Sequence, residues 1–214
     1  MIIFILGKPN SGKGTQAIMV EEKYKMTHID SGKNLRSWVA REDNYITRKV
    51  NETMDKGEFV PIAIATKLWM DTLLTTKEHE NILFEGAPRK YFEAEIITEY
   101  FNWLGEKPSV FFIDIPDQEV LHRSAIRTYC PKCNKTYSSV LNPGITVCED
   151  DQTPLQVRDD DKEEVVQNRL KVFYNEVQPS LDFFKERGML HTIDGVGSVE
   201  EVFKRLDDMI TQLM

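Results

Sequence analysis

The sequence predicts a three-layer α/β fold, in which a parallel β-sheet is covered by helices and a phosphate-binding P-loop follows the first strand. Short apolar runs alternate with amphipathic helical stretches along the chain, which is typical of parallel strands joined by helices. A glycine-rich turn containing a lysine follows the first apolar run directly. With 214 residues, 41% of them hydrophobic, the chain is long enough to bury one core and to carry inserted segments.

The first predicted strand, residues 2–6, leads into the loop G-K-P-N-S-G-K-G-T at residues 7–15. The loop has the spacing G-x-x-x-x-G-K, with Gly14 where Ser or Thr is commoner and Thr15 one place later. Backbone N–H groups and a helix N-terminus surround phosphate oxygens in such a loop, and Lys13 adds charge at the outer phosphates. A chance glycine-rich turn is the alternative, but the strand-then-helix context favours nucleotide binding.

The remaining regular elements follow in order. Pro61 is predicted to begin a helix that runs past Trp69, whose indole we expect to pack in the core. Further strands are predicted at residues 81–84, 110–113 and 190–193. The last helix is the clearest, because a capping box of Ser198 and Glu201 begins a run of apolar residues spaced three and four apart.

Two stretches interrupt the alternation of strands and helices. They cover residues 31–60 and 123–160, and both are interpreted as insertions at the sheet edge that binds phosphate. The core is then expected to comprise residues 1–30, 61–122 and 161–214.

The second insertion contains two short pairs with the spacing of metal ligands, C-x-x-C and C-x-x-D. The predicted ligands are Cys130, Cys133, Cys148 and Asp151. Three thiolates and one carboxylate complete a tetrahedral Zn²⁺ site, whose role would be structural, although sulfur ligands also suit iron. Glu149 and Asp150 are alternative fourth ligands, and a disulfide or free thiols are the alternative to a metal. A segment this short has little apolar surface, so a metal would stiffen it.

The net charge of -8 argues against a general nucleic-acid or membrane-surface binder, whose footprint is basic. Lys132 and Lys135 of the cysteine-containing segment are likewise offset by neighbouring carboxylates. The N-terminal apolar run lacks the basic flank of a signal peptide, and no run is long enough to span a membrane. Three clustered cysteines are unlike a secreted disulfide framework. We therefore expect a cytoplasmic enzyme for small molecules, and a monomer because nothing demands an oligomer.

Six arginines flank the loop or the insertions: Arg36, Arg89, Arg123, Arg127, Arg158 and Arg169. Planar guanidinium groups suit the delocalised charge of a transferring phosphoryl group. Arg123 and Arg127 are four residues apart, so they share a face if the preceding helix continues. A flap that closes over the loop would keep water away from a bound nucleoside triphosphate. For any single arginine, a solvated surface position is the alternative.

Together these motifs resemble the adenylate kinase family, in its bacterial form with a long zinc-bearing lid, over the whole chain. The loop resembles the family's G-x-P-G-x-G-K-G-T. The string D-S-G-K-N-L-R at residues 30–36 resembles S-T-G-D-x-L-R, and E-G-A-P-R at residues 85–89 resembles D-G-F-P-R. In the lid, C-x-x-C, C-x-x-D, R-D-D-D from residue 158 and N-R-L from residue 168 follow in the family's order.

The resemblance implies the reversible reaction ATP + AMP ⇌ 2 ADP by direct in-line transfer, with Mg²⁺ on the triphosphate. It implies a nucleoside-monophosphate (NMP) domain at residues 31–60 and a lid domain at residues 123–160. The implied ATP contacts are Gly7, Pro9, Asn10, Ser11, Gly12, Lys13, Gly14, Thr15, Arg123, Arg127 and Gly197. The implied NMP contacts are Ser31, Arg36, Glu58, Val60, Gly86, Arg89, Glu93, Arg158 and Arg169. The implied catalytic residues are Lys13, Arg89, Arg123, Arg127, Arg158 and Arg169.

The resemblance also implies how the arginines divide the work. Arg123 would stack on the adenine of ATP. The groups that would converge on the transferring phosphoryl are Arg127, Arg158 and Arg169. The α-phosphate of AMP would be bound by Arg36 and Arg89. Hinge and closure contacts would be made by Asp160 and Asp161.

The magnesium site departs from the family pattern. The aspartate of D-G-F-P-R, which holds water on Mg²⁺, is Glu85 here, and the aspartate of S-T-G-D is Lys33. Because Mg²⁺ demands near-ideal octahedral geometry and keeps several waters, Glu85 is expected to act through a shifted water network. The sequence therefore predicts weak metal affinity.

The base-reading position departs as well, since the family's glutamine is Glu93 here. Glutamine accepts from adenine N6 and donates to N1, whereas an ionised glutamate only accepts and can take both N1–H and N2–H of guanine. Asn10, Ser31 and Ala87 also differ from the family. Overall similarity favours AMP as the acceptor, and GMP is the alternative.

A reading from another class is a regulatory nucleotide-binding module with little turnover, or a GTPase-like switch. Guanine-specific GTPases usually carry N-K-x-D, and the nearest string, residues 134–137, lacks the aspartate. Such a switch would also have no need of six arginines.

Overall fold

A five-stranded parallel sheet forms the centre of the molecule. The computed structural model describes residues 1–77, 80–133, 135–139, 142–158 and 161–213. The strands are β1 (Ile2–Gly7), β2 (Thr27–Asp30), β3 (Ile82–Glu85), β4 (Ser109–Asp114) and β7 (Leu190–Asp194). Their order across the sheet is β2-β3-β1-β4-β7, so β1 lies in the middle, between β3 and β4. The parallel α/β class expected from the sequence is confirmed, and the phosphate loop leaves the central strand.

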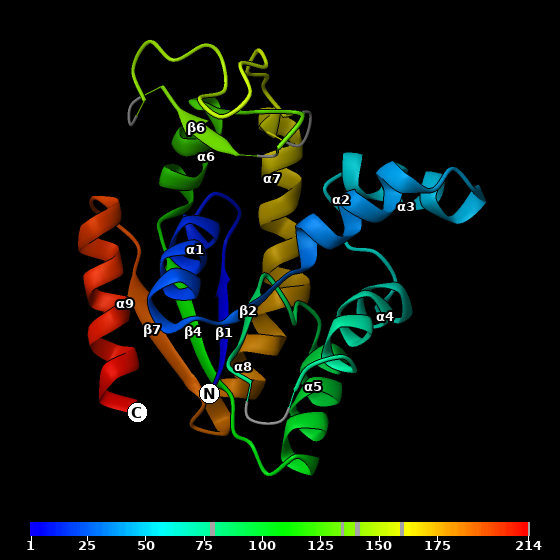
Figure 1. The fold of residues 1–214 in the computed structure, drawn as a ribbon, viewed down its shortest axis with the longest axis vertical. Helices are drawn as coiled ribbons and strands as arrows, with labels where there is room; N and C mark the ends of the chain where they lie inside the picture. Colours follow the sequence, from blue (N-terminus) through cyan, green and yellow to red (C-terminus); the bar gives the residue numbers. More distant parts are fainter. Residues whose placement is uncertain (78–79, 134, 140–141, 159–160, 214) are drawn as a thin grey trace.

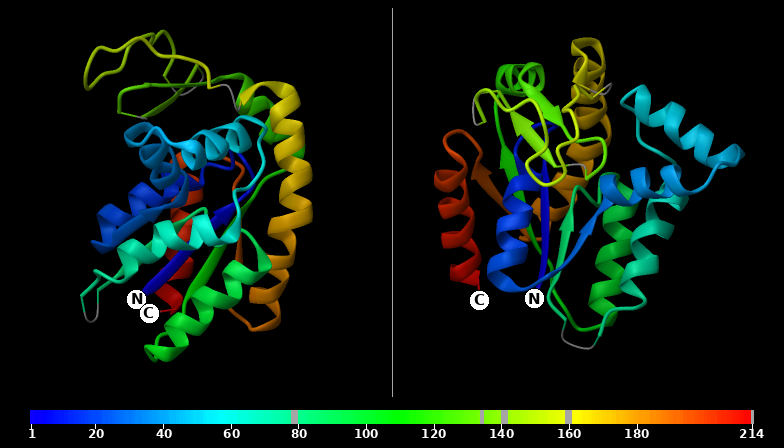
Figure 2. Two further views of the ribbon diagram at one scale, coloured as in Figure 1. Left: turned by 90° about the vertical axis from the view of Figure 1, so that its right-hand side faces the viewer. Right: turned by 45° about the horizontal axis from the view of Figure 1, so that its top comes forward.

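Helices cover both faces of the sheet (Figures 1 and 2). On one face lie α1 (Lys13–Tyr24) and α9 (Val199–Leu213), packed on Ile3 and Ile5 of β1. On the other lie α4 (Ile62–Leu73), α5 (Tyr91–Trp103) and α8 (Gln178–Glu186), packed on Phe4 and Leu6. Successive side chains of β1 thus enter opposite cores, as the period of a strand buried on both sides requires.

The second of these cores is largely aromatic. The ring of Phe4 lies 5.1 Å from that of Phe84 and 6.0 Å from those of Phe101 and Phe184, measured between centroids. Trp69 of α4 is buried against Phe84 with a ring separation of 6.0 Å, so its expected role in packing is confirmed. Offset and edge-on aromatic pairs of this kind add stability beyond the area they bury.

Residues 31–60 form a small helical unit beside the sheet. It consists of α2 (Ser31–Arg41) and α3 (Tyr45–Asp55). Asp30 caps α2 by accepting from the Lys33 N–H at 2.9 Å, and Asn44 forms a capping box with Thr47 at the start of α3. An apolar cluster around Leu35, Val50 and Val60 joins the unit to Ile64 and Leu68 of α4. Helices thus fill the first stretch that interrupts the sheet pattern.

The cysteine-containing segment forms a lid above the carboxyl ends of the strands (Figure 1). Its two short strands, β5 (Arg127–Tyr129) and β6 (Thr136–Ser138), pair antiparallel. The chain reaches it from α6 (Asp117–Ala125) and leaves through α7 (Glu163–Val172), which continues through a π-helical turn η2 (Phe173–Val177) into α8. The two helices α6 and α7 pack against each other through Val120 and Val166, below the lid.

Several local features differ from the sequence-based expectations. Strand β2 was not expected, because its sequence T-H-I-D places only Ile29 in the core and lacks an apolar run. The helix before the lid does not continue to Arg127: α6 ends at Ala125 and Arg127 begins β5, where Thr128 and Tyr129 favour extended backbone. The expected capping box of the last helix is confirmed, since Ser198 and Glu201 exchange hydrogen bonds at 2.8 and 3.2 Å. No helix in the described ranges is both long and apolar enough to cross a membrane.

Candidate active site

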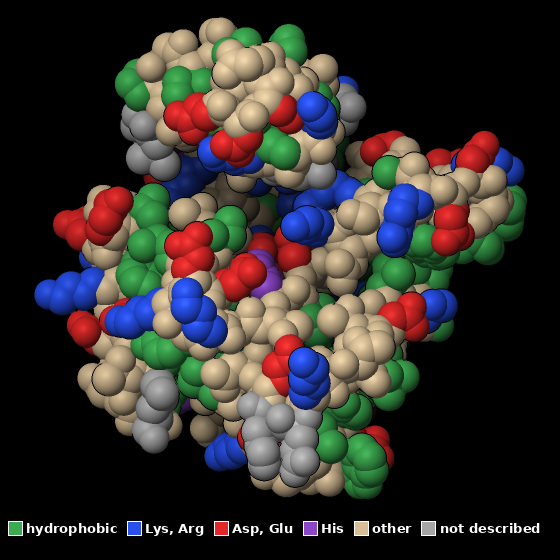
Figure 3. Space-filling model, viewed as in Figure 1, with side chains coloured by type: hydrophobic (Ala, Val, Ile, Leu, Met, Phe, Trp, Pro, Cys, Tyr) green, Lys and Arg blue, Asp and Glu red, His purple; other side chains and the backbone are tan. Residues whose placement is uncertain are grey.

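A cavity of about 330 Å³ lies where the core, residues 31–60, the lid and α7 meet. Figure 3 shows this region hollowed beneath the lid, with Lys and Arg side chains gathered along it. Of the residues expected from the sequence to contact nucleotide, its wall includes Gly7, Pro9, Lys13, Ser31, Arg36, Glu58, Val60, Gly86, Arg89, Glu93, Arg158 and Arg169. The fold therefore gathers into one cavity residues that are up to 162 positions apart, from Gly7 to Arg169.

The phosphate loop is shaped by its glycines. A Cβ on Gly7 would lie 2.9 Å from the Ile113 carbonyl oxygen, so no side chain fits there. Gly12 has φ 87°, in the left-handed region that glycine adopts without strain. Asn10 also has positive φ, 58°, and its amide donates to the Ser124 hydroxyl on α6. These contacts fix the conformation of the loop immediately before α1.

Lys13, the first residue of α1, is partly buried among charged groups. Its ammonium donates to the Lys8 carbonyl oxygen at 3.3 Å. Burial lowers the pKa of Lys13 to about 8; the Glu85 carboxylate raises it in part, and the charges of Arg169, Arg89 and Arg127 lower it further. The positive charges gathered around Lys13 therefore disfavour its protonated form. Such a cluster of cations favours the binding of an anion.

Glu85 ends strand β3 and faces the phosphate loop. A Cβ on Gly14 would lie 3.1 Å from its carboxylate, which shows how closely the two approach. Behind it lies His28 of β2, with Nε2 3.5 Å from Glu85 Oε2 and Nδ1 2.8 Å from Glu21 Oε2. Burial lowers the pKa of His28, but the two carboxylates outweigh burial and raise it overall. His28 and Glu21 were not singled out from the sequence, because nothing marked residues 27–30 as a strand ending at this site.

Arg89 lies in the cavity wall next to residues 31–60. It donates to the Gly86 carbonyl oxygen at 2.6 Å and to the Ser31 hydroxyl at 3.3 Å, and its guanidinium lies 4.9 Å from the Phe59 ring centroid. Burial lowers its pKa, although neighbouring carboxylates of Glu93, Asp30 and Glu85 partly restore it. A guanidinium fixed on several sides is preorganised for an anion.

The arginines near the lid are positioned from different elements. Arg123 of α6 pairs with Glu119 at 2.7 Å and donates to the carbonyl oxygens of Ser11 and Gly195, at 3.3 and 3.1 Å. It therefore touches the phosphate loop and the segment that contains Gly197. Arg127 makes a two-point contact with the buried Asp161 carboxylate. Arg127 lies on β5 and not on α6, so it does not share a helix face with Arg123. Its position is set by the contact with Asp161.

The remaining two arginines approach from the lid and α7. Arg158 lies over the Tyr129 ring at 4.9 Å. The Arg169 side chain passes close to Gly57, where an added Cβ would lie 2.6 Å from Arg169 Cγ, and Gly57 has φ 72°. Gly57 thus allows residues 31–60 to approach α7, a requirement that was not recognised from the sequence. Asp160, expected to act in the hinge, lies outside the described residues.

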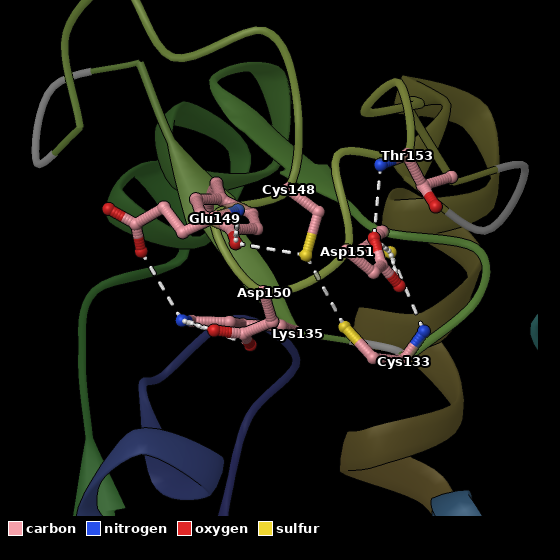
Figure 4. A network of polar contacts seen from close by, with 9 residues as sticks. Cys133, Lys135, Cys148, Glu149, Asp150, Asp151 and Thr153 are labelled. Atoms are coloured by element: carbon pink, nitrogen blue, oxygen red, sulfur yellow. Dashed lines mark hydrogen bonds and ion pairs between the residues drawn. The ribbon is translucent and has the colours of Figure 1, made fainter.

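The four expected metal ligands converge in the lid, and Figure 4 labels three of them, Cys133, Cys148 and Asp151. Ligand atoms of Cys130, Cys133, Cys148 and Asp151 all lie within 4.8 Å of one another. Cys133 Sγ is 3.6 Å from Cys148 Sγ, and Cys130 Sγ is 3.6 Å from both Asp151 carboxylate oxygens. A tetrahedral zinc with Zn–S bonds near 2.3 Å places its sulfurs about 3.8 Å apart, so the donor set and its spacing suit zinc.

A second layer of hydrogen bonds orients these ligands. The Tyr137 hydroxyl, buried in the lid, donates to Cys148 Sγ at 3.4 Å and accepts from the Glu149 N–H at 3.1 Å. This hydrogen bond is the main cause that lowers the pKa of the Cys148 thiol. Asp151 accepts from the Thr153 N–H at 3.0 Å, and its pKa is lowered to about 2 mainly by that contact. The neighbouring acids Glu149 and Asp150 instead pair with Lys135, each at 3.2 Å, which leaves Asp151 as the carboxylate that faces the sulfurs.

Comparison with known proteins agrees with the arrangement of the site. The model of the adenylate kinase family matches residues 5–189. The chain is 35% identical over 213 residues to an adenylate kinase of Hydrogenobaculum sp. (strain Y04AAS1), covering 98% of this chain and 100% of that relative. It is 34% identical to an adenylate kinase of Methanothrix thermoacetophila, over 99% of both chains, and 32% identical to one of Archaeoglobus fulgidus, over 100% of this chain and 99% of the relative. The chain belongs to the adenylate kinase family and is a phosphotransferase of the nucleoside monophosphate kinase type.

Proposed function

We propose that the protein transfers the γ-phosphoryl group of ATP directly to AMP, forming two ADP, with both nucleotides bound in the cavity beneath the lid. The observation that carries this proposal is the meeting of Lys13, Arg36, Arg89, Arg158 and Arg169 on the wall of one cavity. These cations come from the phosphate loop, the helical unit, the core, the lid and α7. A site that needs only to hold one nucleotide has no use for cations from so many segments.

The donor phosphates occupy the loop of residues 7–15 in this proposal. Their oxygens accept from the loop N–H groups and from Lys13, which regains its proton fully when phosphate lies beside it. Arg123 is already tied to the loop through Ser11 and reaches Gly195 on the far side, so it borders the place where the base of ATP emerges. Stacking of its guanidinium on adenine then needs only a change of rotamer.

Transfer takes place between this loop and the arginines opposite. Arg127, Arg158 and Arg169 neutralise the charge on the equatorial oxygens as the phosphoryl group passes, while Arg36 and Arg89 hold the α-phosphate of AMP. The geometry calls for no covalent enzyme intermediate, because positioning and charge neutralisation supply most of the rate enhancement. The lid and residues 31–60 act as movable segments that exclude water when both nucleotides are bound.

Mg²⁺ accompanies ATP in this family, and the carboxylate of Glu85 suits an oxygen-binding cation beside the phosphate loop. Mg²⁺ bound there would neutralise charge on the donor phosphates. Glu85 would hold water on the metal, with its orientation fixed by His28. Lys33 offers no metal ligand, and its backbone N–H serves the cap of α2.

The lid is proposed to bind one structural zinc through Cys130, Cys133, Cys148 and Asp151. The metal would supply the cohesion that the small apolar cluster of the lid lacks, because the buried members of that cluster among the described residues are Cys130, Tyr137 and Cys148, packed by Ile145 and Leu155. We further propose that the protein works as a monomer in the cytoplasm, where the thiols stay reduced.

A coupled assay of ADP formation from ATP and AMP tests the proposal. We expect Arg89→Met to lower kcat/KM for AMP by about 10³-fold, since a partly buried charge that binds phosphate is lost. The matched control is Arg48→Met, which removes an exposed arginine of α3 paired only with Asp43 among the described residues, and it should leave kcat/KM within about twofold. Stoichiometric ATP binding without ADP formation from any monophosphate would instead favour a regulatory module.

A further inference from the structure

Glu93, in the first turn of α5, is a buried carboxyl group in the wall of the cavity. Only 3% of the residue is exposed. Its Oε2 accepts from the Arg89 N–H at 2.9 Å, which fixes the orientation of the carboxyl group relative to the arginine that follows β3. Burying a carboxyl group lowers the stability of the fold unless its oxygens have hydrogen-bond partners. The contact with the Arg89 N–H satisfies only part of the hydrogen-bonding capacity of Glu93.

The residues around Glu93 indicate what kind of ligand the cavity can bind. Arg36 and Arg89 form a cationic region of the same cavity, whereas Leu35, Val60, Leu68 and Trp69 provide an apolar wall. This combination suits an anion joined to a flat ring, with a polar ring edge that meets Glu93. A purine monophosphate has all three parts.

The protonation state of a carboxyl group determines which purine edge it can pair with. A neutral acid offers one donor and one acceptor, which matches N1 and the N6 amino group of adenine. A carboxylate offers two acceptors, which match N1–H and the N2 amino group of guanine. We propose that Glu93 selects the acceptor base through its protonation state, so that the enzyme phosphorylates both AMP and GMP and the share of GMP rises with pH. This inference rests on the proposed function and extends its range of acceptors.

The charges around Glu93 allow both states. Burial raises the pKa of Glu93, while the N–H groups and positive charges of Arg89 and Lys90 lower it less strongly. From other elements, the cavity also brings Arg36 of α2, Glu58 of the segment before α4 and Arg169 of α7. The ammonium group of Lys90 also forms an ion pair with Glu176 of η2 at 3.8 Å. A pKa above the ordinary range means that the neutral acid persists at low pH and is lost as pH rises, so pairing with AMP weakens and pairing with GMP strengthens in that direction.

The test is the ratio of kcat/KM for GMP to that for AMP, measured with saturating ATP from about pH 5.5 to about pH 8.5. For the natural protein we expect the ratio to rise at least about tenfold over this range, because one buried mismatch replaces another. IMP keeps N1–H but lacks the N2 amino group, so its kcat/KM should lie below that of GMP at high pH and follow the same trend.

Glu93→Gln supplies the matched variant, since the amide has the same shape and cannot ionise. It should keep AMP as a substrate, lower kcat/KM for GMP by about 10- to 100-fold and make the ratio independent of pH. Glu99→Gln, an exposed carboxyl group on the same helix, should leave both the ratio and its pH dependence unchanged.

The outcomes separate the inference from the proposed function. Phosphorylation of AMP with no detectable use of GMP at any pH, or a ratio that is the same in Glu93→Gln, overturns the role of Glu93 and leaves the proposed function intact. Failure of ATP to phosphorylate either monophosphate overturns both. Because the pH dependence is measured on the natural protein, the inference remains testable if Glu93→Gln folds poorly.

Discussion

At the scale of single residues, Glu85 is a departure from the family pattern that lies beside the phosphate loop. Its carboxylate lies between the phosphate loop and His28, within the field of Lys13. The histidine is in turn held by Glu21, so a row of three side chains from β3, β2 and α1 fixes the acid. Such outer contacts orient a metal-bound group and tune its basicity. The longer side chain is thus constrained to one place beside the loop.

We expect Glu85→Gln to lower kcat by at least about 100-fold, because the neutral amide holds water on Mg²⁺ less strongly and cannot balance the charge of Lys13. The measurement is ADP formation across a Mg²⁺ titration. Glu85→Asp serves as the control, since it keeps the charge while shortening the side chain, and a raised Mg²⁺ requirement with a smaller loss of kcat is expected. Near-normal turnover of Glu85→Gln would remove Glu85 from the mechanism.

At the scale of elements, three side chains attach the phosphate loop to α6, the helix that leads into the lid, and to Ile115 just before it: those of Lys8, Asn10 and Arg123. Lys8 is 8% exposed, and it donates to the Ile115 carbonyl oxygen and pairs with Asp117, both at 2.9 Å. Asn10 donates to Ser124, and Arg123 donates to Ser11. The loop and the base of the lid are therefore connected by side chains that the P-loop pattern does not include.

We expect Ser124→Ala to raise KM for ATP by about 3- to 10-fold with little change in KM for AMP, because Asn10 loses the partner that holds the loop. Ser180→Ala is the matched control, a buried serine of α8 whose hydroxyl has no hydrogen-bond partner within the described residues. Initial rates with each nucleotide varied in turn provide the measurement. Equal KM values for ATP in the two variants would show that the contact does not position the loop.

The sequence predicted those elements whose signal is local. Strands β1, β3 and β4 appeared as apolar runs, because both faces of the sheet are covered by helices. Strand β7 was also expected, although Ile193 is its one buried residue. Strand β2 lies at the edge of the sheet, where burial of Ile29 alone leaves no apolar run. Helix α6 ends at Ala125 because the residues from Arg127 onward pair with β6. This pairing joins residues about ten positions apart, so it was not visible in the local sequence. Tertiary pairing of this kind overrides the helical spacing of two arginines.

The candidate site was predictable to a similar extent. Motif spacing identified Lys13, Arg36, Arg89, Arg158 and Arg169, which meet in the cavity. The resemblance placed Arg127 among the phosphate-binding groups, yet its anchor on Asp161 depends on where the lid strand begins. Lys8, His28 and Gly57 were missed because their importance arises from neighbours remote in sequence. Their residue types alone indicate nothing about the site.

At the scale of the whole molecule, our proposal makes the cohesion of the lid depend on a metal held by the four converging ligands. We expect purified protein to contain about one zinc per chain, and chelation to loosen the lid while the central sheet stays folded. Amide hydrogen exchange measures this directly. The N–H groups of Tyr129 and Cys148, bonded within the lid at 2.8 Å each, should exchange faster without metal, while the N–H of Val110 in β4 should not.

Elemental analysis before and after chelation is the control for metal loss. Protein that contains no zinc, or chelated protein whose lid amides exchange as slowly as before, would contradict a structural metal. Loss of protection throughout the chain would show that the core also depends on the metal.

The loop, the helical unit, the lid and α7 together line one cavity. Our central proposal is that two nucleotides exchange a phosphoryl group there. The most direct test of this claim uses ATP with an isotopically chiral γ-phosphate and AMP as acceptor. Direct in-line transfer predicts that the chiral phosphate appears as the β-phosphate of ADP with inverted configuration. Retained configuration would require a phosphorylated enzyme, and release of the label as inorganic phosphate without consumption of AMP would contradict transfer between two bound nucleotides.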